Sequence, residues 1–270
     1  MAEVWSLGTL GVESRDAGAD RSEYLVYFGL PLGPAVRELI RGRQTVAGAE
    51  MMDAVEVSLE DWQRTYRQRS SPFAVGKNWW VDPREPDLRL TDAPDQRRSL
   101  RIPARTAFGT GSHASTALMV ELMEEMRFED KRVLDVGTGS GILAMIALAM
   151  GAESVTAVDI DPVATFVARE TCRLNGFLPR LLAGGMAAIR LRDPSKAYDV
   201  ALANVLPTRL RADIADVVAS LRPAGVLLLS GMLRDQQSEV VAEMAGLGLR
   251  CKSRHYQEEW VALRLERLRS

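Results

Sequence analysis

A short apolar strand followed at once by a glycine-rich turn is the feature that most constrains this chain. The strand is Arg132–Val136, and the next segment, Gly137–Gly141, reads GTGSG before an apolar stretch of helical character. Glycines in such a turn let the backbone bend sharply and let a ligand approach it closely. The order of strand, glycine turn and helix predicts an open parallel α/β sheet that binds a ligand at the carboxyl ends of its strands.

The glycine spacing indicates which ligand this turn would bind. Dinucleotide enzymes usually carry G-x-G-x-x-G and place a pyrophosphate on the helix N-terminus, whereas this turn has G-x-G-x-G. Asp135 precedes the turn, and Asp159 ends the next predicted strand. Carboxylates at these places suit the ammonium group and ribose hydroxyls of S-adenosylmethionine better than a phosphate. The alternatives are a glycine turn beside an unrelated aspartate, and a nicotinamide or other nucleotide site.

Beyond Ala107 the chain alternates short β-branched runs with helical stretches, the pattern of a parallel sheet with helices on both faces. The predicted strands are Arg132–Val136, Ser154–Asp159, Arg180–Leu182, Tyr198–Asn204 and Gly225–Ser230. The predicted helices are Ser112 (as the cap) to Glu125, Gly141–Met150, Pro162–Asn175, Ala212–Leu221 and Asp235–Ala245. The tail, Arg250–His255 with Trp260–Leu265, reads as a hairpin at the sheet edge. The expected fold is α/β: a Rossmann-like, seven-stranded, mostly parallel sheet with an antiparallel terminal hairpin.

The N-terminal part has a different pattern, and we expect three segments: a small α+β domain at 1–70, a connector at 71–102 and the domain with the glycine turn at 103–270. The elements expected in the first segment are strands near Val12 and at Tyr24–Phe28, a helix at Pro34–Arg41, a strand at Val55–Ser58 and a helix at Leu59–Arg69. The connector is rich in Pro, Asp and Arg and contains Trp79 and Trp80. These tryptophans are interpreted either as a substrate-facing pair or as a cluster packed between domains.

Charge and composition narrow the classes of partner. The 34 Lys and Arg residues nearly balance 36 Asp and Glu residues, so no global field exists to hold a polyanion or an acidic membrane. The two cysteines, Cys172 and Cys251, suit reduced thiols, and no His/Cys spacing resembles a zinc site. Neither a membrane span nor a signal pattern is apparent. We therefore expect a cytoplasmic protein without a metal or a membrane partner, to which nucleic acid could still bind locally.

Several segments around the glycine turn together resemble the ribosomal protein L11 methyltransferase family. They are Thr106–Thr116, which reads TAFGTGSHAST, Leu202–Leu206, Ser230–Leu233 and Glu258–Trp260. The likeness covers about 100–267 well and is looser from Ser58 to Trp80. Three departures stand out: the N-terminal unit looks short by an element, Ala114 replaces a common proline, and Pro207 is unusual at its place.

The resemblance implies S-adenosylmethionine as cofactor and assigns roles residue by residue. The expected cofactor-binding residues are Phe108, Thr116, Asp135, Gly137, Gly139, Asp159, Met186 and Asn204. Thr116 would make its contact through its hydroxyl, or it would simply bond its own helix. The region before Met186 offers no acidic side chain for the adenine, so backbone groups would serve there. Phe108 would line the cofactor site or fill the core.

Two residues are candidates for contacting the amine that would accept the methyl group. Asn204 ends a predicted strand, where its amide oxygen would accept a hydrogen bond from the amine; the alternative is an asparagine that only begins a turn. His113 would be either a general base or a capping and packing residue.

The reaction expected from the resemblance is methyl transfer to amino groups of a large-subunit ribosomal protein, on lysine side chains or an N-terminal amine. The attacking amine must be neutral. At pH 7.5 a lysine with a pKa of about 10.4 is ~0.1% neutral, whereas an α-amine near 7.8 is roughly one-third neutral. The alternatives are a methyltransferase for another protein lysine or a small amine, and a ribosome-associated factor that binds the cofactor without turnover.

Overall fold

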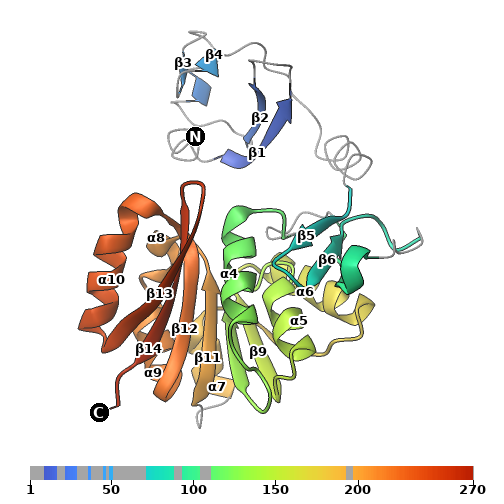
Figure 1. Cartoon of the computed structure of the whole chain (residues 1–270). Helices are drawn as coiled ribbons and strands as arrows, with labels where there is room; N and C mark the ends of the chain where they lie inside the picture. Colours follow the sequence, from blue (N-terminus) through green and yellow to red (C-terminus); the bar gives the residue numbers. More distant parts are fainter. Residues whose placement is uncertain are drawn as a thin grey trace. The chain divides into compact units, whose positions relative to one another are not determined.

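A computed structural model describes residues 9–16, 22–28, 36–37, 45–46, 49–50, 71–87, 93–103, 111–192 and 197–269 (Figure 1). The chain forms two compact units, Met1–Leu59 and Glu60–Ser270, and each is described by itself. The predicted strand at Val55–Ser58 and helix at Leu59–Arg69 lie outside the described residues. Among the described residues, no helix is both long and apolar enough to cross a membrane.

The larger unit is built on one seven-stranded sheet with the order β10-β9-β8-β11-β12-β14-β13 (Figure 1). Its strands are β8 (Arg132–Val136), β9 (Ser154–Asp159), β10 (Arg180–Ala183), β11 (Tyr198–Asn204), β12 (Leu221–Leu233), β13 (Leu249–Gln257) and β14 (Trp260–Arg267). Neighbouring strands from β10 to β12 are parallel, and β14 is antiparallel to both β12 and β13. The predicted mostly parallel sheet with an antiparallel terminal hairpin is confirmed.

Helices cover both faces of this sheet. They are α4 (Ala114–Glu124), α5 (Ile142–Ala149), α6 (Pro162–Leu174), α7 (Met186–Arg192), α8 (Pro207–Leu210), α9 (Ile214–Ser220) and α10 (Gln237–Gly246), with short 3-10 turns η1 (Pro94–Gln96) and η2 (Arg234–Gln236). Helices α7 and α8 were not predicted from the sequence. Pro207, unusual in the sequence, is the first residue of α8, where the missing N–H of proline costs no hydrogen bond.

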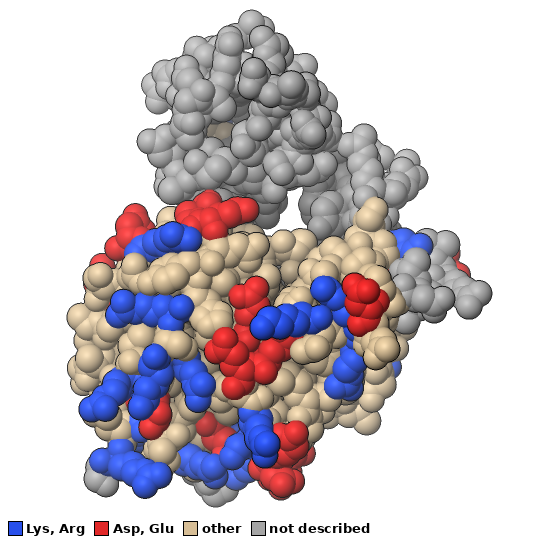
Figure 2. Space-filling view, in the orientation of Figure 1, with Lys and Arg blue, Asp and Glu red and all other residues tan. Residues whose placement is uncertain are grey.

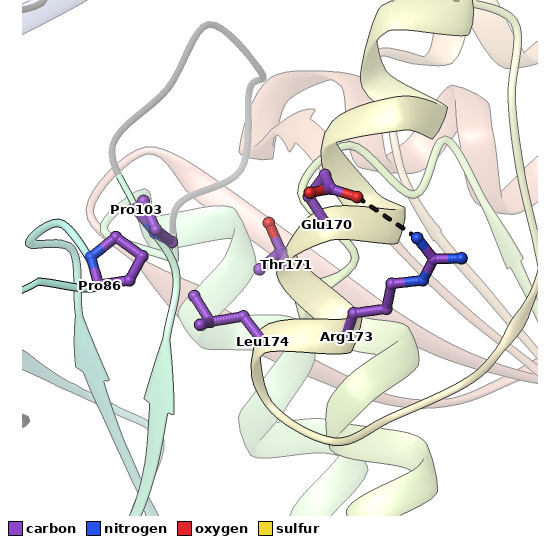
Figure 3. A pocket seen from close by; sticks show the side chains of 6 residues that line it. All are labelled: Pro86, Pro103, Glu170, Thr171, Arg173 and Leu174. Carbon is purple, nitrogen blue, oxygen red and sulfur yellow. Dashed lines mark ion pairs between the residues drawn. The ribbon is translucent and has the colours of Figure 1, made fainter.

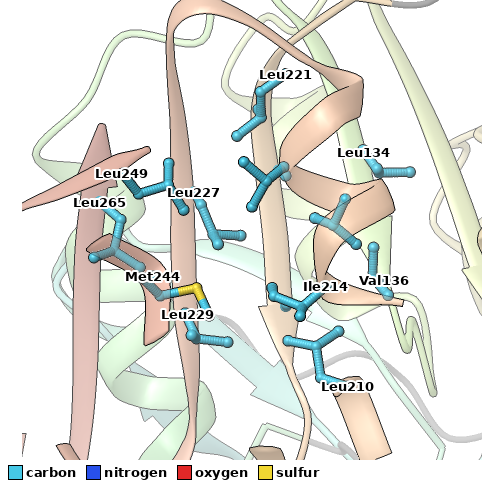
Figure 4. Close-up of a cluster of buried hydrophobic side chains, with 14 of the residues drawn as sticks. Leu134, Val136, Leu210, Ile214, Leu221, Leu227, Leu229, Met244, Leu249 and Leu265 are labelled. Atoms are coloured by element: carbon cyan, nitrogen blue, oxygen red, sulfur yellow. The ribbon is translucent and has the colours of Figure 1, made fainter. Parts of the chain in front are cut away.

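The main core lies between the sheet and the helices α8, α9 and α10. Strand residues such as Leu134, Leu227 and Leu229 meet Ile214 and Met244 from the helices, and all five are buried (Figure 4). Buried and exposed residues do not alternate along β8 and β11, because both faces of these strands are buried. This packing fixes the strand ends that carry the site.

A second, three-stranded sheet precedes α4. It contains β5 (Phe73–Val75), β6 (Trp79–Asp82) and β7 (Arg98–Arg101), with β6 antiparallel to β5 and parallel to β7. Trp79 is buried in it, and the Arg98 guanidinium lies 5.0 Å from the centre of the Trp79 ring. The region expected to be a connector with some extended structure is therefore an ordered sheet of the larger unit.

Hydrogen bonds fasten this small sheet to three helices of the larger unit. The backbone amides of Lys77 and Asn78 donate to the Glu124 carboxylate in α4, at 2.8 to 3.1 Å. The Arg98 guanidinium donates to the last carbonyl of α5, and the Asn175 side chain at the end of α6 bonds both backbone groups of Arg101, at 2.8 and 2.7 Å. The turn between β5 and β6 is thus tied to α4, and β7 is tied to α5 and α6.

The smaller unit holds two antiparallel strand pairs: β1 (Thr9–Asp16) with β2 (Ser22–Phe28), and β3 (Thr45–Val46) with β4 (Ala49–Glu50). The strands predicted near Val12 and at Tyr24–Phe28 are confirmed. Figure 2 shows basic and acidic side chains together on one face of the larger unit. In its terminal hairpin, Lys252 of β13 pairs with Glu266 of β14 at 3.2 Å.

Candidate functional site

The glycine turn between β8 and α5 is pinned to the end of the neighbouring strand. The backbone amides of Gly137 and Thr138 donate to the carbonyl of Val158, at 2.9 and 3.0 Å. Gly137 has a φ of +71°, and a Cβ added to it would overlap the Cγ1 atom of Val205. Glycine is therefore required at 137 both by the backbone conformation and by the close approach of Val205.

Asp159 ends β9 and faces this turn. Its Oδ2 accepts a hydrogen bond from the Gly139 amide at 2.9 Å, and its Oδ1 accepts one from the Asp161 amide at 3.0 Å. Asp161 in turn caps α6 by accepting from the Val163 amide. The Asp159 carboxylate is partly exposed and is held by backbone donors in an orientation from which it can accept further hydrogen bonds.

Asp135, at the base of the turn, is almost fully buried. Its Oδ2 accepts from the Thr138 hydroxyl at 2.7 Å, and its Oδ1 has no hydrogen-bond partner. Burial raises the pKa of this carboxyl to about 7, and the charge of Asp159 adds to the rise. Hydrogen bonding to the Thr138 hydroxyl and to the Ala144 backbone opposes it. A buried carboxyl oxygen without a partner is suited to a donor or a cation supplied by a ligand.

Asn204 ends β11, which is the direct neighbour of β8 on the side opposite β9. Its Nδ2 donates to the hydroxyl of Thr116 in α4, at 3.1 Å. Thr116 is fully buried, whereas Asn204 is partly exposed. The structure therefore brings these two predicted residues into direct contact, at the same edge of the sheet as the glycine turn.

The other predicted residues fall into three cases. Met186 begins α7, just beyond β10, and its side chain is buried in the core, so only its backbone can face a ligand. Phe108 lies outside the described residues. His113, and not Ser112 as the sequence analysis expected, is the N-cap of α4, because its Nδ1 accepts from the Ser115 amide at 3.2 Å.

The histidine is also packed, since its ring meets Trp260 edge-on with centroids 4.5 Å apart. Burial lowers the pKa of His113, although the charge of Glu259 opposes this. A neutral imidazole is what the cap requires, because Nδ1 must keep its lone pair to accept the Ser115 amide. The capping and packing role predicted for His113 is therefore present in the structure.

Two residues of the site were not predicted. Thr138 supplies the hydrogen bond to Asp135, and Val205 packs over Gly137. A threonine inside a glycine turn was a visible signal for the first. Nothing in the sequence marks the second, since its contact joins segments far apart in the chain.

A cavity of about 320 Å³ lies elsewhere, between the small sheet and the last turns of α6 (Figure 3). It is lined by Pro86, Pro103, Glu170, Thr171, Arg173 and Leu174. The site at the strand ends is thus distinct from this cavity. The strand-end site contains two aspartates, which would repel a pyrophosphate and therefore suit a zwitterionic nucleoside ligand better. Asp159 is placed to accept hydrogen bonds from ribose hydroxyls.

Comparisons with known proteins identify the family of this chain. The sequence model of the family described as "Ribosomal protein L11 methyltransferase (PrmA)" matches residues 35–268. A protein named ribosomal protein L11 methyltransferase from Geobacter metallireducens is 38% identical over 205 residues, which cover 76% of this chain and 65% of that protein. One of the same name from Ralstonia pickettii is 33% identical over 267 residues, covering 90% of this chain and 85% of its own length.

A solved structure supports the same relationship. The crystal structure of a ribosomal protein L11 methylase from Lactobacillus delbrueckii subsp. bulgaricus aligns with a TM-score of 0.66 and 26% identity, covering 74% of this chain and 100% of that one. The family match spans the β-sheet, the glycine turn and the terminal hairpin. The chain belongs to the ribosomal protein L11 methyltransferase family.

Proposed function

We propose that this protein is an S-adenosylmethionine-dependent methyltransferase that modifies amino groups of ribosomal protein L11. The observation that carries the proposal is that Asp159, held against the glycine turn by the Gly139 amide, shares one sheet edge with Asn204. An acidic cofactor site and an amide for the acceptor would then lie side by side. Relatives named for this activity support the choice of acceptor.

The cofactor would be held by residues of three strand ends. Asp159 would accept its ribose hydroxyls, the free Oδ1 of Asp135 would face its ammonium group, and the turn containing Gly137 and Gly139 would allow its close approach. Backbone groups at Met186 would face the adenine, and Phe108 remains predicted to contact the cofactor. When bound, S-adenosylmethionine supplies a methyl group on a positively charged sulfur.

The contribution of the protein to the transfer is mainly positioning. The Nδ2 of Asn204 donates to Thr116, which leaves Oδ1 to accept a hydrogen bond from the N–H of the acceptor amine and so to direct the amine lone pair. His113 is engaged in the α4 cap, so we assign it no proton transfer. The amine must therefore arrive neutral, which favours an α-amine over a lysine at neutral pH.

We infer that residues 1–70 dock the acceptor protein, because the described site residues all lie in the larger unit. A ribosomal acceptor also implies a cytoplasmic reaction, and we expect the enzyme to act as a monomer without contacting nucleic acid or a membrane.

The proposal is tested with methyl-tritiated S-adenosylmethionine and two acceptors, purified ribosomal protein L11 and total lysate protein. Label in L11 that disappears with Asp159→Ala and persists with Glu153→Ala supports the proposal; Glu153 is an exposed carboxylate beside the opposite end of β9. Label confined to another protein indicates a different acceptor. Binding of the cofactor with no label in any protein would indicate a small acceptor or a protein without turnover.

A further inference from the structure

Asn204 is held from two directions. On one side, the Nδ2 of Asn204 donates a hydrogen bond to the Thr116 hydroxyl at 3.1 Å. Thr116 lies in the first turn of α4 and is completely buried. A buried hydroxyl in a packed helix has little freedom, so its partner amide is fixed as well. On the other side, Asn204 is paired with Ser230 in the β11–β12 ladder.

Val205, the next residue, is enclosed between two glycines. Its side chain packs over Gly137 of the glycine turn, where an added Cβ would overlap Cγ1 of Val205. Its backbone lies against Gly231 in β12, which has a φ of +87° and at which a Cβ would come within 2.7 Å of the Val205 carbonyl. The segment that carries Asn204 is therefore fixed between the cofactor turn and β12.

In the structure the amide nitrogen of Asn204 is bonded to Thr116, and the amide oxygen is the available atom. With Nδ2 given to Thr116, the oxygen Oδ1 is the free end, and an oxygen can only accept. Reversing the amide would present an N–H group to the amine. That group would donate to the amine lone pair, the electron pair needed for attack on the methyl group.

We propose that Thr116 and Val205 are positioning residues for the acceptor amine: Thr116 orients the Asn204 amide, and Val205 sets its place relative to the glycine turn. This inference rests on the proposed function. It differs from the role that the family resemblance implies for Thr116, which is a hydroxyl contact to the cofactor. On this inference the hydroxyl acts on the methyl acceptor through Asn204.

The test compares Thr116→Val, which keeps the shape and removes the hydroxyl, with Thr116→Ser, which keeps the hydroxyl. Single-turnover transfer from S-adenosylmethionine to ribosomal protein L11 should slow about tenfold or more in Thr116→Val and stay within about threefold of wild type in Thr116→Ser. Cofactor affinity by calorimetry should change by less than about twofold in both. The double variant Thr116→Val with Asn204→Ala should be no slower than Asn204→Ala alone, because the two residues act as a unit.

Other outcomes overturn the inference. A Thr116→Val variant that loses cofactor affinity yet transfers at wild-type speed when saturated would make Thr116 a cofactor contact. If Asn204→Ala slows transfer and Thr116→Val does not, the positioning role fails while the proposed function stands. Wild-type transfer by Asn204→Ala would instead remove the proposed role of Asn204 itself. If Thr116→Val does not fold, Val205→Ala provides the test: slowed transfer with unchanged cofactor affinity is expected, and wild-type transfer contradicts the inference.

Discussion

The Oδ2 atom of Asp159 accepts a hydrogen bond from the backbone amide of Gly139, 2.9 Å away. The two residues meet because β8 and β9 are parallel neighbours, so the turn after one strand lies beside the last residue of the other. The carboxylate therefore has two tasks, which are to hold the glycine turn and to accept hydrogen bonds from a ligand. Variants at 159 can separate these tasks.

We expect Asp159→Ala to weaken S-adenosylmethionine binding by about tenfold or more, since hydrogen bonds to a charged group are worth roughly 1.5–3 kcal/mol. Asp159→Asn should lose less, because its amide oxygen can still accept from Gly139 while the charge is gone. Calorimetry with the cofactor measures both. Glu153→Ala is the matched control, and unchanged affinity in a folded Asp159→Ala would show that the acidic cofactor residue lies elsewhere.

Asn204→Ala should lower the methyl-transfer rate far more than cofactor affinity, because the free Oδ1 faces the acceptor in the proposed mechanism. Single-turnover transfer to ribosomal protein L11, measured beside cofactor calorimetry, separates the two effects. Asn175→Ala is a suitable control: it removes another amide that bonds the Arg101 backbone, so it should cost stability and leave the rate unchanged. Equal rates for Asn204→Ala and wild type would contradict the assignment.

Much of the catalytic fold could be predicted because its strands are buried on both faces and read as continuous apolar runs. Strands β8, β9 and β11 have the predicted bounds. β12 runs from Leu221 to Leu233 and is longer than the predicted strand. Its two ends were not predicted because Pro223 and Gly231 interrupt the strand pattern in the sequence. The helices α7 and α8 were missed, since seven and four residues are too few to show a helical period.

Some features of the site could also be predicted from the sequence, and others could not. Asp159 and Asn204 could be predicted because the ends of parallel strands converge on one edge. The contacts that fix them could not, since the bond from Asn204 to Thr116 and the packing of Val205 on Gly137 join segments far apart in the sequence. The cap of α4 was placed at Ser112 because serine is the commoner N-cap; the backbone instead gives that place to His113.

The raised pKa of Asp135 predicts a pH-dependent stability. Because this pKa rises from 3.8 to about 7 on folding, the native state binds more protons than the unfolded state between those values. The free energy of unfolding contributed by Asp135 should therefore fall as pH rises from about 4 to 7, by up to roughly 4 kcal/mol. Urea unfolding of wild type and Asp135→Asn at pH 5 and pH 8 measures this.

Wild type and Asp135→Asn share all other titrating groups, so the difference between their free energies of unfolding isolates the contribution of Asp135. Asp135→Asn should gain stability relative to wild type on going from pH 5 to pH 8, whereas Glu153→Gln, at an exposed carboxyl, should follow wild type at both. A constant difference between wild type and Asp135→Asn would show that Asp135 ionises normally.

His113 offers a test of capping against catalysis. His113→Ala removes the acceptor for the Ser115 amide and should destabilise the protein by about 1 kcal/mol more than His113→Asn, since asparagine is a good N-cap. Both variants lose the ring contact with Trp260, so the comparison isolates the cap. Single-turnover transfer should stay near wild type in both. A folded His113→Asn with strongly slowed transfer would make the histidine a participant in the reaction.

The last prediction concerns where the chain can be cut. A fragment of residues 71–270 should fold and bind S-adenosylmethionine, because it keeps the small sheet and the described site residues. A fragment that begins at Leu100 should be much less stable. It lacks β5, β6 and the Arg98 side chain, so Glu124 and the end of α5 lose their partners and the surface covered by Trp79 is exposed.

Transfer by the 71–270 fragment tests the proposed docking role of residues 1–70. Without docking, the effective concentration of the acceptor amine at the methyl group falls, so transfer to ribosomal protein L11 should drop steeply at low acceptor concentration and recover in part at high concentration. Cofactor affinity should match that of the intact chain. Equal transfer at all acceptor concentrations would contradict docking, and a fragment that aggregates without binding cofactor would mean that residues 1–70 instead cover an apolar face of the larger unit.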